Sequence, residues 1–105
     1  MGAFAAISRP EDLRGVLKDG TRAGERGLAV YVRRSTETGP RLGMVVRAPN
    51  AVIRNRVKRR LRAAFREAGP VGGTDVVIRA DGRAAGKDFQ EMVKIIRGAL
   101  GVSRA

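Results

Sequence analysis

Apolar side chains recur along the chain at two different periods, and these periods separate predicted strands from predicted helices. Residues 27–34 and 41–47 alternate apolar with polar or charged side chains, which predicts two half-buried strands. Residues 75–80 are almost continuously apolar, which predicts a third and central strand. Helical spacing precedes, separates and follows these strands, so the expected order is α-β-β-α-β-α. This order predicts an α/β (α+β) fold, a small two-layer sandwich with helices packed on a mixed sheet.

The first predicted helix begins at Ser8, which has the spacing of a capping box with Glu11, and it ends at Gly20. The last predicted helix is capped by Asp88 and ends at Gly101. Its apolar stripe consists of Phe89, Met92, Val93, Ile96, Ala99 and Leu100. Residues 81–86 are expected to form a loop, and a further short strand is expected near residues 22–26.

Residues 35–40 read as a hairpin loop that would pair the first two strands. Leu28, Val30 and Val32 would then share the core face with Leu42, Met44 and Val46. The opposite face would carry one aromatic residue among cations, namely Tyr31, Arg33, Arg41 and Arg47. Two interpretations stay open for this face: a surface for single-stranded nucleic acid with a base on Tyr31, or a tyrosine packed under a helix.

The middle helix, over residues 50–66, has the most unusual composition of the chain. Its apolar stripe falls within an arc of roughly 120° on an ideal helix and consists of Ile53, Val57, Leu61, Ala64, Phe65 and Ala68. Asn50 is the expected N-cap, and Gly69-Pro70 ends the helix. The opposite side carries Asn55, Lys58, Arg59, Arg62 and Arg66, with Arg56 and Arg60 at one shoulder. Arg54 falls inside the apolar arc, so it is expected to reach outward from the first turn.

Positive charge is concentrated in this part of the chain. Residues 41–66 contain nine Lys or Arg and no Asp or Glu, out of a net charge of +12 for 105 residues. Like charges at i, i+4 spacing destabilise a helix by a few tenths of a kcal/mol per pair. A polyphosphate partner would relieve this repulsion, and a solvated basic face without a partner is the alternative.

The composition argues against several classes of function. The chain has no His and no Cys, so it lacks the commonest general base, the commonest metal ligand and any thiolate. Asp75 and Asp81 could in principle hold Mg²⁺, but both are more simply turn residues that flank a strand. No apolar run has membrane-spanning length, and residues 1–7 lack the basic start of a signal peptide. We expect one cytoplasmic domain over residues 1–105, with its core at about 9–100, no membrane partner and no small-molecule substrate.

The basic helix also carries a recognisable motif. The run Arg54-Asn55-Arg56-Val57-Lys58-Arg59-Arg60-Leu61-Arg62 resembles the RNR motif of the bacterial ribonuclease P protein subunit. The preceding residues 41–46 and 50–52, and the following residues 73–78, are also similar to that family. The resemblance covers roughly residues 10–100.

The resemblance implies a left-handed strand–helix–strand crossover and two RNA partners. One is the catalytic ribonuclease P RNA subunit, bound through the basic helix. The other is precursor tRNA, whose single-stranded 5′ leader would lie in a central cleft and be removed by phosphodiester hydrolysis. The catalytic groups would belong to the RNA, so no catalytic residue is expected here. The protein alone would bind no cofactor or metal, and Mg²⁺ would be required by the RNA-containing holoenzyme.

The resemblance assigns residues to two sites. The RNA-binding helix would use Arg54, Asn55, Arg56, Lys58, Arg59, Arg62 and Arg66. The leader cleft would use Leu13, Leu17, Tyr31, Arg33 and Arg47. The family usually has phenylalanines where this chain has Leu13 and Leu17, and its segment before Asn50 is usually longer. We therefore expect weaker leader contacts than the family norm and a complete docking helix.

Two other classes of function remain as alternatives. A structural RNA-binding protein of ribosomal type would share the basic helix without a role in cleavage. A DNA-binding module would need a helix-turn-helix partner, whereas strands are predicted on both sides of the basic helix.

Overall fold

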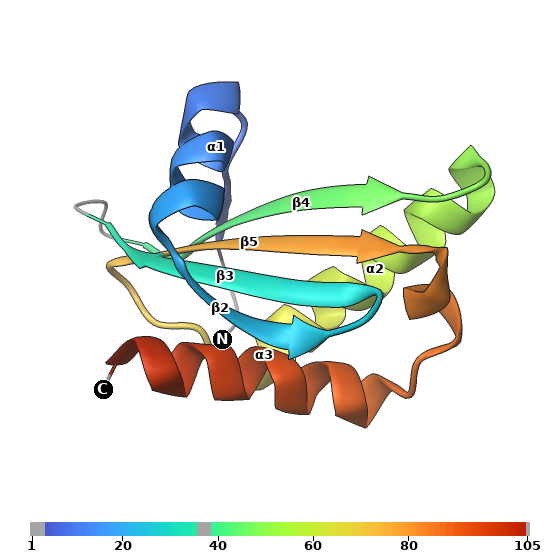
Figure 1. The fold of residues 1–105 in the computed structure, drawn as a ribbon. Coiled ribbons are helices and arrows are strands. Elements are labelled where there is room, and N and C mark those ends of the chain that lie inside the picture. The colour runs from blue at the N-terminus through green and yellow to red at the C-terminus, as the bar shows by residue number, and fades with distance from the viewer. Residues whose placement is uncertain (1–3, 36–38, 105) are drawn as a thin grey trace.

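Strand β5 (Thr74–Asp81) lies at the centre of a five-stranded mixed sheet. The structure, a computed structural model, describes residues 4–35 and 39–104. The sheet order is β1-β4-β5-β3-β2, with β4 parallel to β5 and β3 antiparallel to it (Figure 1). The other strands are β1 (Ala5–Ala6), β2 (Thr21–Glu25), β3 (Leu28–Arg34) and β4 (Arg41–Arg47). The predicted central position of the third apolar strand is therefore confirmed.

The predicted hairpin between the strands now labelled β3 and β4 is wrong, because β5 lies between them. Val76, Val77 and Ile78 are fully buried, so β5 needs covered faces and a neighbouring strand on each edge. The predicted loop over residues 35–40 falls partly on residues 36–38, outside the described part of the chain. The short strand expected near residues 22–26 is β2. Strand β1 was not predicted, because two residues are too few to show a period.

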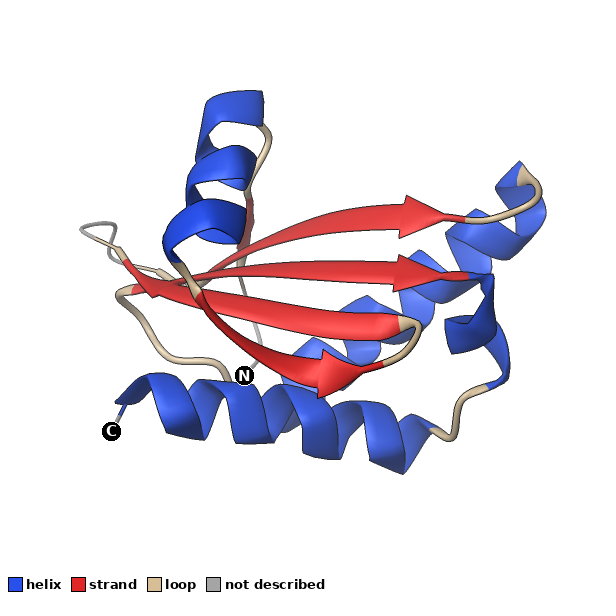
Figure 2. Ribbon diagram, in the orientation of Figure 1, coloured by secondary structure: helices blue, strands red, loops and turns tan. Residues whose placement is uncertain are grey.

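Three α-helices pack on the sheet, namely α1 (Pro10–Asp19), α2 (Ala51–Ala68) and α3 (Phe89–Arg104). Helices α2 and α3 cover one face, and α1 stands against one end of the other face (Figure 2). The predicted α/β sandwich is confirmed. Helix α2 passes behind the sheet between the parallel strands β4 and β5, which makes this crossover left-handed (Figure 1).

The capping residues in the sequence predicted both ends of α2 correctly. Asn50 Oδ1 accepts a hydrogen bond from the Ile53 amide at 2.9 Å, so Asn50 is the N-cap. Gly69 ends the helix in the left-handed region with φ of 75°. The conformational freedom of glycine makes this C-terminal turn possible without strain.

Other predicted helix boundaries were wrong. Ser8 does not cap α1: Pro10 takes the first helical position, which makes Arg9 the N-cap, and Arg9 forms no side-chain capping bond. Helix α3 continues past Gly101 to Arg104, while Asp88 Oδ2 accepts from the Glu91 amide as predicted. The predicted loop after β5 contains a 3₁₀ helix, η1 (Gly82–Gly86), because the Asp81 side chain caps it through the Arg83 amide.

The main core lies between the sheet and helices α2 and α3. Phe65 of α2 is fully buried there, and the ring of Phe4 meets it edge-on at 4.9 Å between centroids. A smaller cluster lies under α1 and contains Ile7, Val16 and Val77. The absence of a side chain at Gly43 makes room for Leu13 there, so a larger residue at position 43 would force the end of the Leu13 side chain to move.

A buried carboxylate joins α1 to this second face of the sheet. Asp75 is 1% exposed and accepts two hydrogen bonds from Arg41, each 2.8 Å long. Arg33 Nη2 lies 3.6 Å from Asp75 Oδ2, and strand register places both arginines directly beside Asp75. From α1, Asp12 approaches Arg41 at 3.8 Å and Asp19 approaches Arg33 at 3.9 Å. We call these five residues the Asp75 network.

The Asp75 network corrects two predictions. Asp75 is a buried member of β5 rather than a turn residue, whereas Asp81 does end that strand. Arg33 and Arg41, expected to decorate an exposed surface, instead neutralise an internal carboxylate. Their pairing with Asp75 is a contact between distant parts of the chain, which strand alternation alone does not reveal.

The arginines keep Asp75 ionised. Burial is the largest single influence and raises the pKa of the Asp75 carboxyl. The hydrogen bonds and charge of Arg41, with contributions from Ser35 and Arg33, outweigh burial and hold this pKa below its ordinary value of 3.8. The native state therefore contains a charged carboxylate between two guanidinium groups.

Replacing Asp75 with Asn is expected to lower the free energy of unfolding by about 3 kcal/mol, because two partly buried arginines would lose their counter-charge. Urea denaturation monitored by circular dichroism measures this change. Asp19→Asn is the matched control: Asp19 is exposed and its ion pair is long, so a change below about 1 kcal/mol is expected. Equal losses in the two variants would contradict a special role for the buried carboxylate.

The stabilising contribution of Asp75 is expected to be complete above about pH 4 and to be lost on acidification. The pKa of Asp75 is lower in the folded chain than its ordinary 3.8, so the unfolded chain binds more protons as pH falls through this range. Urea titrations between pH 7 and pH 2.5 should show a smaller acid-induced loss in Asp75→Asn than in the unmodified protein. Parallel losses in both proteins would refute this assignment.

Candidate nucleic-acid interface

The exposed side of α2 presents a continuous polar and cationic surface. Asn55, Lys58, Arg59 and Arg62 line one shallow hollow together with Val52. Their spacing of three, four and seven residues places them on one side of the helix. Val52 is 69% exposed, so an apolar side chain lies at the edge of this surface. We call these five residues the α2 surface.

The packed side of α2 fixes the orientation of this surface. Val57, Leu61, Ala64 and Phe65 are fully buried against the sheet and α3. A helix held along its whole apolar stripe cannot rotate without opening the core. The cations therefore project in set directions, which lowers the conformational entropy lost when a rigid partner binds.

The remaining arginines of α2 have different surroundings. Arg60 donates two hydrogen bonds of 3.0 Å to the carbonyl groups of Ala84 and Ala85, so it holds η1 against the helix. Arg66 lies 5.2 Å above the Phe4 ring. Arg54 is half-buried and Arg56 is exposed. In the described part of the chain, no cation of α2 forms a salt bridge within 4.0 Å.

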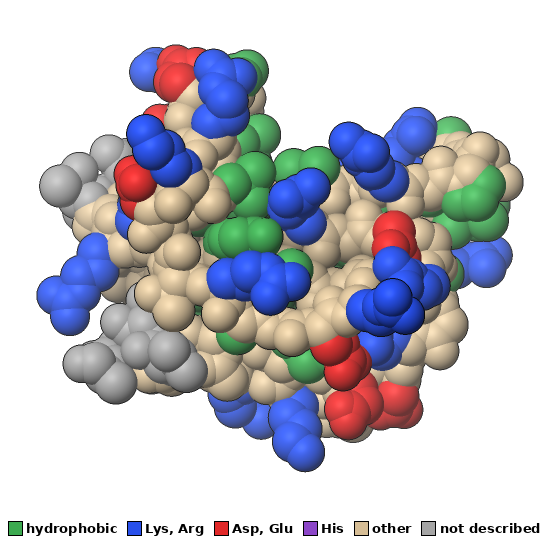
Figure 3. Space-filling view, in the orientation of Figure 1, with side chains coloured by type: hydrophobic (Ala, Val, Ile, Leu, Met, Phe, Trp, Pro, Cys, Tyr) green, Lys and Arg blue, Asp and Glu red, His purple; other side chains and the backbone are tan. Residues whose placement is uncertain are grey.

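The open face of the sheet, beside α1, carries a second candidate surface. Tyr31 packs against the small apolar cluster, as do Leu13 and Leu17 of α1, and it also lines an open hollow with Arg47. Figure 3 shows hydrophobic side chains exposed between α1 and the sheet, with Lys and Arg side chains around them. Four of the five predicted cleft residues therefore lie around the part of this face that is next to α1, namely Leu13, Leu17, Tyr31 and Arg47.

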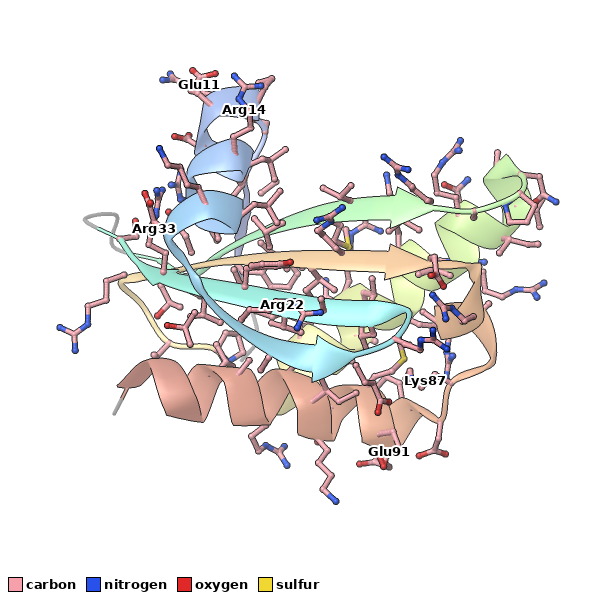
Figure 4. The ribbon with its side chains drawn as sticks, in the orientation of Figure 1. Glu11, Arg14, Arg22, Arg33, Lys87 and Glu91 are labelled. Atoms are coloured by element: carbon pink, nitrogen blue, oxygen red, sulfur yellow. The ribbon has the colours of Figure 1, made fainter. Side chains whose placement is uncertain are left out.

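Arg33, the fifth predicted cleft residue, lies apart from Tyr31's hollow. It belongs to the Asp75 network, and a separate polar hollow contains it together with Arg9 and Arg34. Figure 4 shows Arg33 at the base of α1, whereas Arg22 lies over the strands.

Sequence reasoning missed three cations that line the hollow with Tyr31, namely Arg22, Arg26 and Arg79. Alternation in β5 could have found Arg79, because it has the same strand parity as Val77. Arg22 could not be found without the register, which pairs it with Tyr31.

Among residues 4–35 and 39–104, no three or more His, Cys, Asp or Glu side chains come close enough to hold a metal ion. No described helix combines the length and apolar character needed to cross a membrane. Both surfaces are suited by charge and shape to bind a polyanion.

Comparisons with known proteins identify the family. The family model described as ribonuclease P matches residues 1–102. The ribonuclease P protein component of Kocuria rhizophila is 40% identical over 88 residues, which cover 80% of this chain and 78% of the relative. The corresponding protein of Acidothermus cellulolyticus is 36% identical over 101 residues, covering 90% of this chain and 84% of the relative.

Solved structures agree in fold. The Staphylococcus aureus RNase P protein has a TM-score of 0.76 at 23% identity and covers 97% of both chains. The Thermotoga maritima RNase P protein, in complex with 1-(4-fluorophenyl)-2-thiourea, has a TM-score of 0.71 at 25% identity and covers 94% of this chain and 99% of that one. The chain therefore belongs to the ribonuclease P protein family.

Proposed function

We propose that this chain is the protein component of ribonuclease P and that it binds two RNAs. The α2 surface would bind the catalytic RNA subunit, and the open face beside α1 would bind the single-stranded 5′ leader of precursor tRNA. The holoenzyme would hydrolyse the phosphodiester that joins the leader to the mature tRNA. We place this activity in the cytoplasm.

The observation that carries the proposal is the α2 surface itself. Lys58, Arg59 and Arg62 point away from the core on a helix whose other side is fixed by burial. No acidic residue of the described chain pairs with them. Their mutual repulsion is relieved when phosphates approach, and the counterions released from the RNA favour binding further.

The protein contributes electrostatics and positioning in this mechanism, and the RNA contributes the chemistry. Positive charge between two RNAs reduces their mutual repulsion and so favours the bound substrate. Holding the leader in place fixes the scissile bond relative to the catalytic RNA. Mg²⁺, bound by the RNA, would stabilise the charge that develops on the phosphate oxygens during hydrolysis.

Replacing Arg59 or Arg62 with Ala is expected to weaken binding to ribonuclease P RNA while the free energy of unfolding stays nearly constant. With about six phosphates neutralised, the log–log salt slope should be on the order of −5, and each variant should reduce it by about 1. Filter binding at several salt concentrations measures both quantities.

Arg60→Lys is the matched control on the same helix. It keeps the charge but loses the paired hydrogen bonds to Ala84 and Ala85. We expect a lower denaturation midpoint and little change in the salt slope. The docking role of the α2 surface would be refuted if Arg59→Ala and Arg62→Ala bound RNA as tightly as the unmodified protein.

The activity itself is tested by cleavage of precursor tRNA. The purified protein is combined with a bacterial ribonuclease P RNA at a low Mg²⁺ concentration at which the RNA alone is nearly inactive. We expect faster release of the 5′ leader, with the stimulation reduced in the Arg59→Ala/Arg62→Ala double variant. Tight RNA binding without stimulation would instead indicate a structural RNA-binding protein.

A further inference from the structure

Arg60 belongs to the basic run of α2 but points away from the α2 surface. Successive residues of a helix are about 100° apart, so Arg60 lies about 160° around the helix from Arg62. Its Nη1 donates hydrogen bonds of 3.0 Å to the carbonyl oxygens of Ala84 and Ala85 in η1. The side chain is half-buried. The contacts of Arg60 therefore lie within the fold, although its charge is the same as that of its neighbours.

The first turns of α2 are packed less closely than the rest of the helix. None of residues 51–56 is buried, and Ile53 is the apolar side chain among them that packs on the main core. The first buried residue of the helix is Val57. Figure 1 shows these turns extending past the ends of β4 and β5. The direction in which residues 54–56 project therefore depends on contacts outside the sheet.

The 3₁₀ helix η1 supplies such contacts at two points. Gly82 at its start lies beside Pro49, the residue before the N-cap of α2, and an added Cβ at Gly82 would be 3.5 Å from Pro49 Cδ. Ala84 and Ala85 accept the two hydrogen bonds from Arg60. Carbonyl groups at the end of a helix lack helical partners, so a guanidinium group is a favourable donor to them. Helix α2 is therefore held by η1 both before its first residue and near its middle.

Contacts with the sheet and the core keep η1 itself in place. Asp81 Oδ1 accepts a hydrogen bond of 2.9 Å from the Arg83 amide, and Asp81 Oδ2 lies 2.6 Å from Arg83 Nη2. The Asp81 amide donates to the Gly27 carbonyl at 3.2 Å, and Ala84 is fully buried in the main core. A continuous set of contacts therefore runs from the end of β5 through η1 to Arg60.

We propose that Arg60 is a positioning residue for RNA docking, which fixes the direction of the first turns of α2 through η1 and binds no phosphate itself. This inference rests on the proposed docking of α2 to ribonuclease P RNA. A folded RNA needs the cations that meet it in set positions, and without the contacts to η1 the first turns would have to be ordered when the RNA binds. Arg60 therefore contributes to affinity through the shape of the docking helix.

Arg60→Gln is expected to weaken binding of the whole protein to ribonuclease P RNA about tenfold, the cost of ordering roughly two long side chains on binding. The log–log salt slope should stay unchanged, whereas loss of a phosphate contact would make it shallower by about 1. Filter binding at several salt concentrations measures both quantities. Hydrogen exchange in the free variant should be faster at the amides of residues 54–57 than in the unmodified protein.

Asp81→Ala tests the same contacts without a change in α2. The variant loses the side-chain cap of η1 and one negative charge. Electrostatic attraction alone predicts equal or tighter binding to the RNA, because an acidic group is removed. Positioning through η1 predicts the opposite result, namely binding that is weaker by roughly fivefold, as for loss of one helix cap. The assay contains the RNA subunit without precursor tRNA, so contacts with the leader do not enter.

Val16→Ala is the control for stability, because it opens a cavity in the small cluster under α1, apart from the core that contains α2 and Ala84. It should lower the denaturation midpoint and leave the affinity for the RNA subunit unchanged. Equal weakening of RNA binding by Val16→Ala and Arg60→Gln would overturn the proposal, because general destabilisation would then explain both.

The proposal is also overturned if either Arg60→Gln or Asp81→Ala binds the RNA as tightly as the unmodified protein. A salt slope that becomes shallower by about 1 in Arg60→Gln would overturn it too, since Arg60 would then be a phosphate ligand. If Arg59→Ala still weakens binding in these cases, the docking function stands and this inference alone fails. If Arg59→Ala and Arg62→Ala also bind normally, the proposed function fails as well.

Discussion

The ionised carboxylate of Asp75 is the interaction on which the arrangement of this face of the sheet depends. It is buried, and it stays charged because Arg41 and Arg33 lie beside it on the two neighbouring strands. The same arginines meet Asp12 and Asp19 of α1. A single buried charge therefore links β3, β4 and β5 to one another, and the arginines beside it also meet α1.

The arginines fall into two groups that differ in whether the fold itself supplies their partners. Arg33, Arg41 and Arg60 are occupied by the fold itself, through Asp75 and through the carbonyl groups near η1. The arginines of the α2 surface and of the open face have no such partners in the described chain. Net charge alone does not show this difference between the two groups. The difference nevertheless decides which cations are available to RNA.

The sequence was sufficient for several features that depend on near neighbours, although the cap of α1 and the end of α3 were not among them. The apolar stripe of α2, its Asn50 cap, its end at Gly69 and the central character of β5 are all local patterns, and the structure confirms them. Strand order, the pairing of Asp75 with Arg41, and the separation of Arg33 from Tyr31 are contacts between distant residues. Nothing in a period or a turn signal encodes them, so the predicted hairpin was wrong and the separation of Arg33 from Tyr31 was not foreseen.

The insertion of β5 between β3 and β4 also bears on how the chain folds. Strands β3 and β4 are neighbours in sequence, and closing the short connection between them involves little loss of chain entropy. In the native sheet they are not neighbours, because β5, which follows α2 in the chain, lies between them. The fold therefore depends on long-range pairing, which slows folding. The basic α2 is the connection between β4 and β5, so these parallel neighbours can pair only across a connection that contains the whole RNA-docking helix.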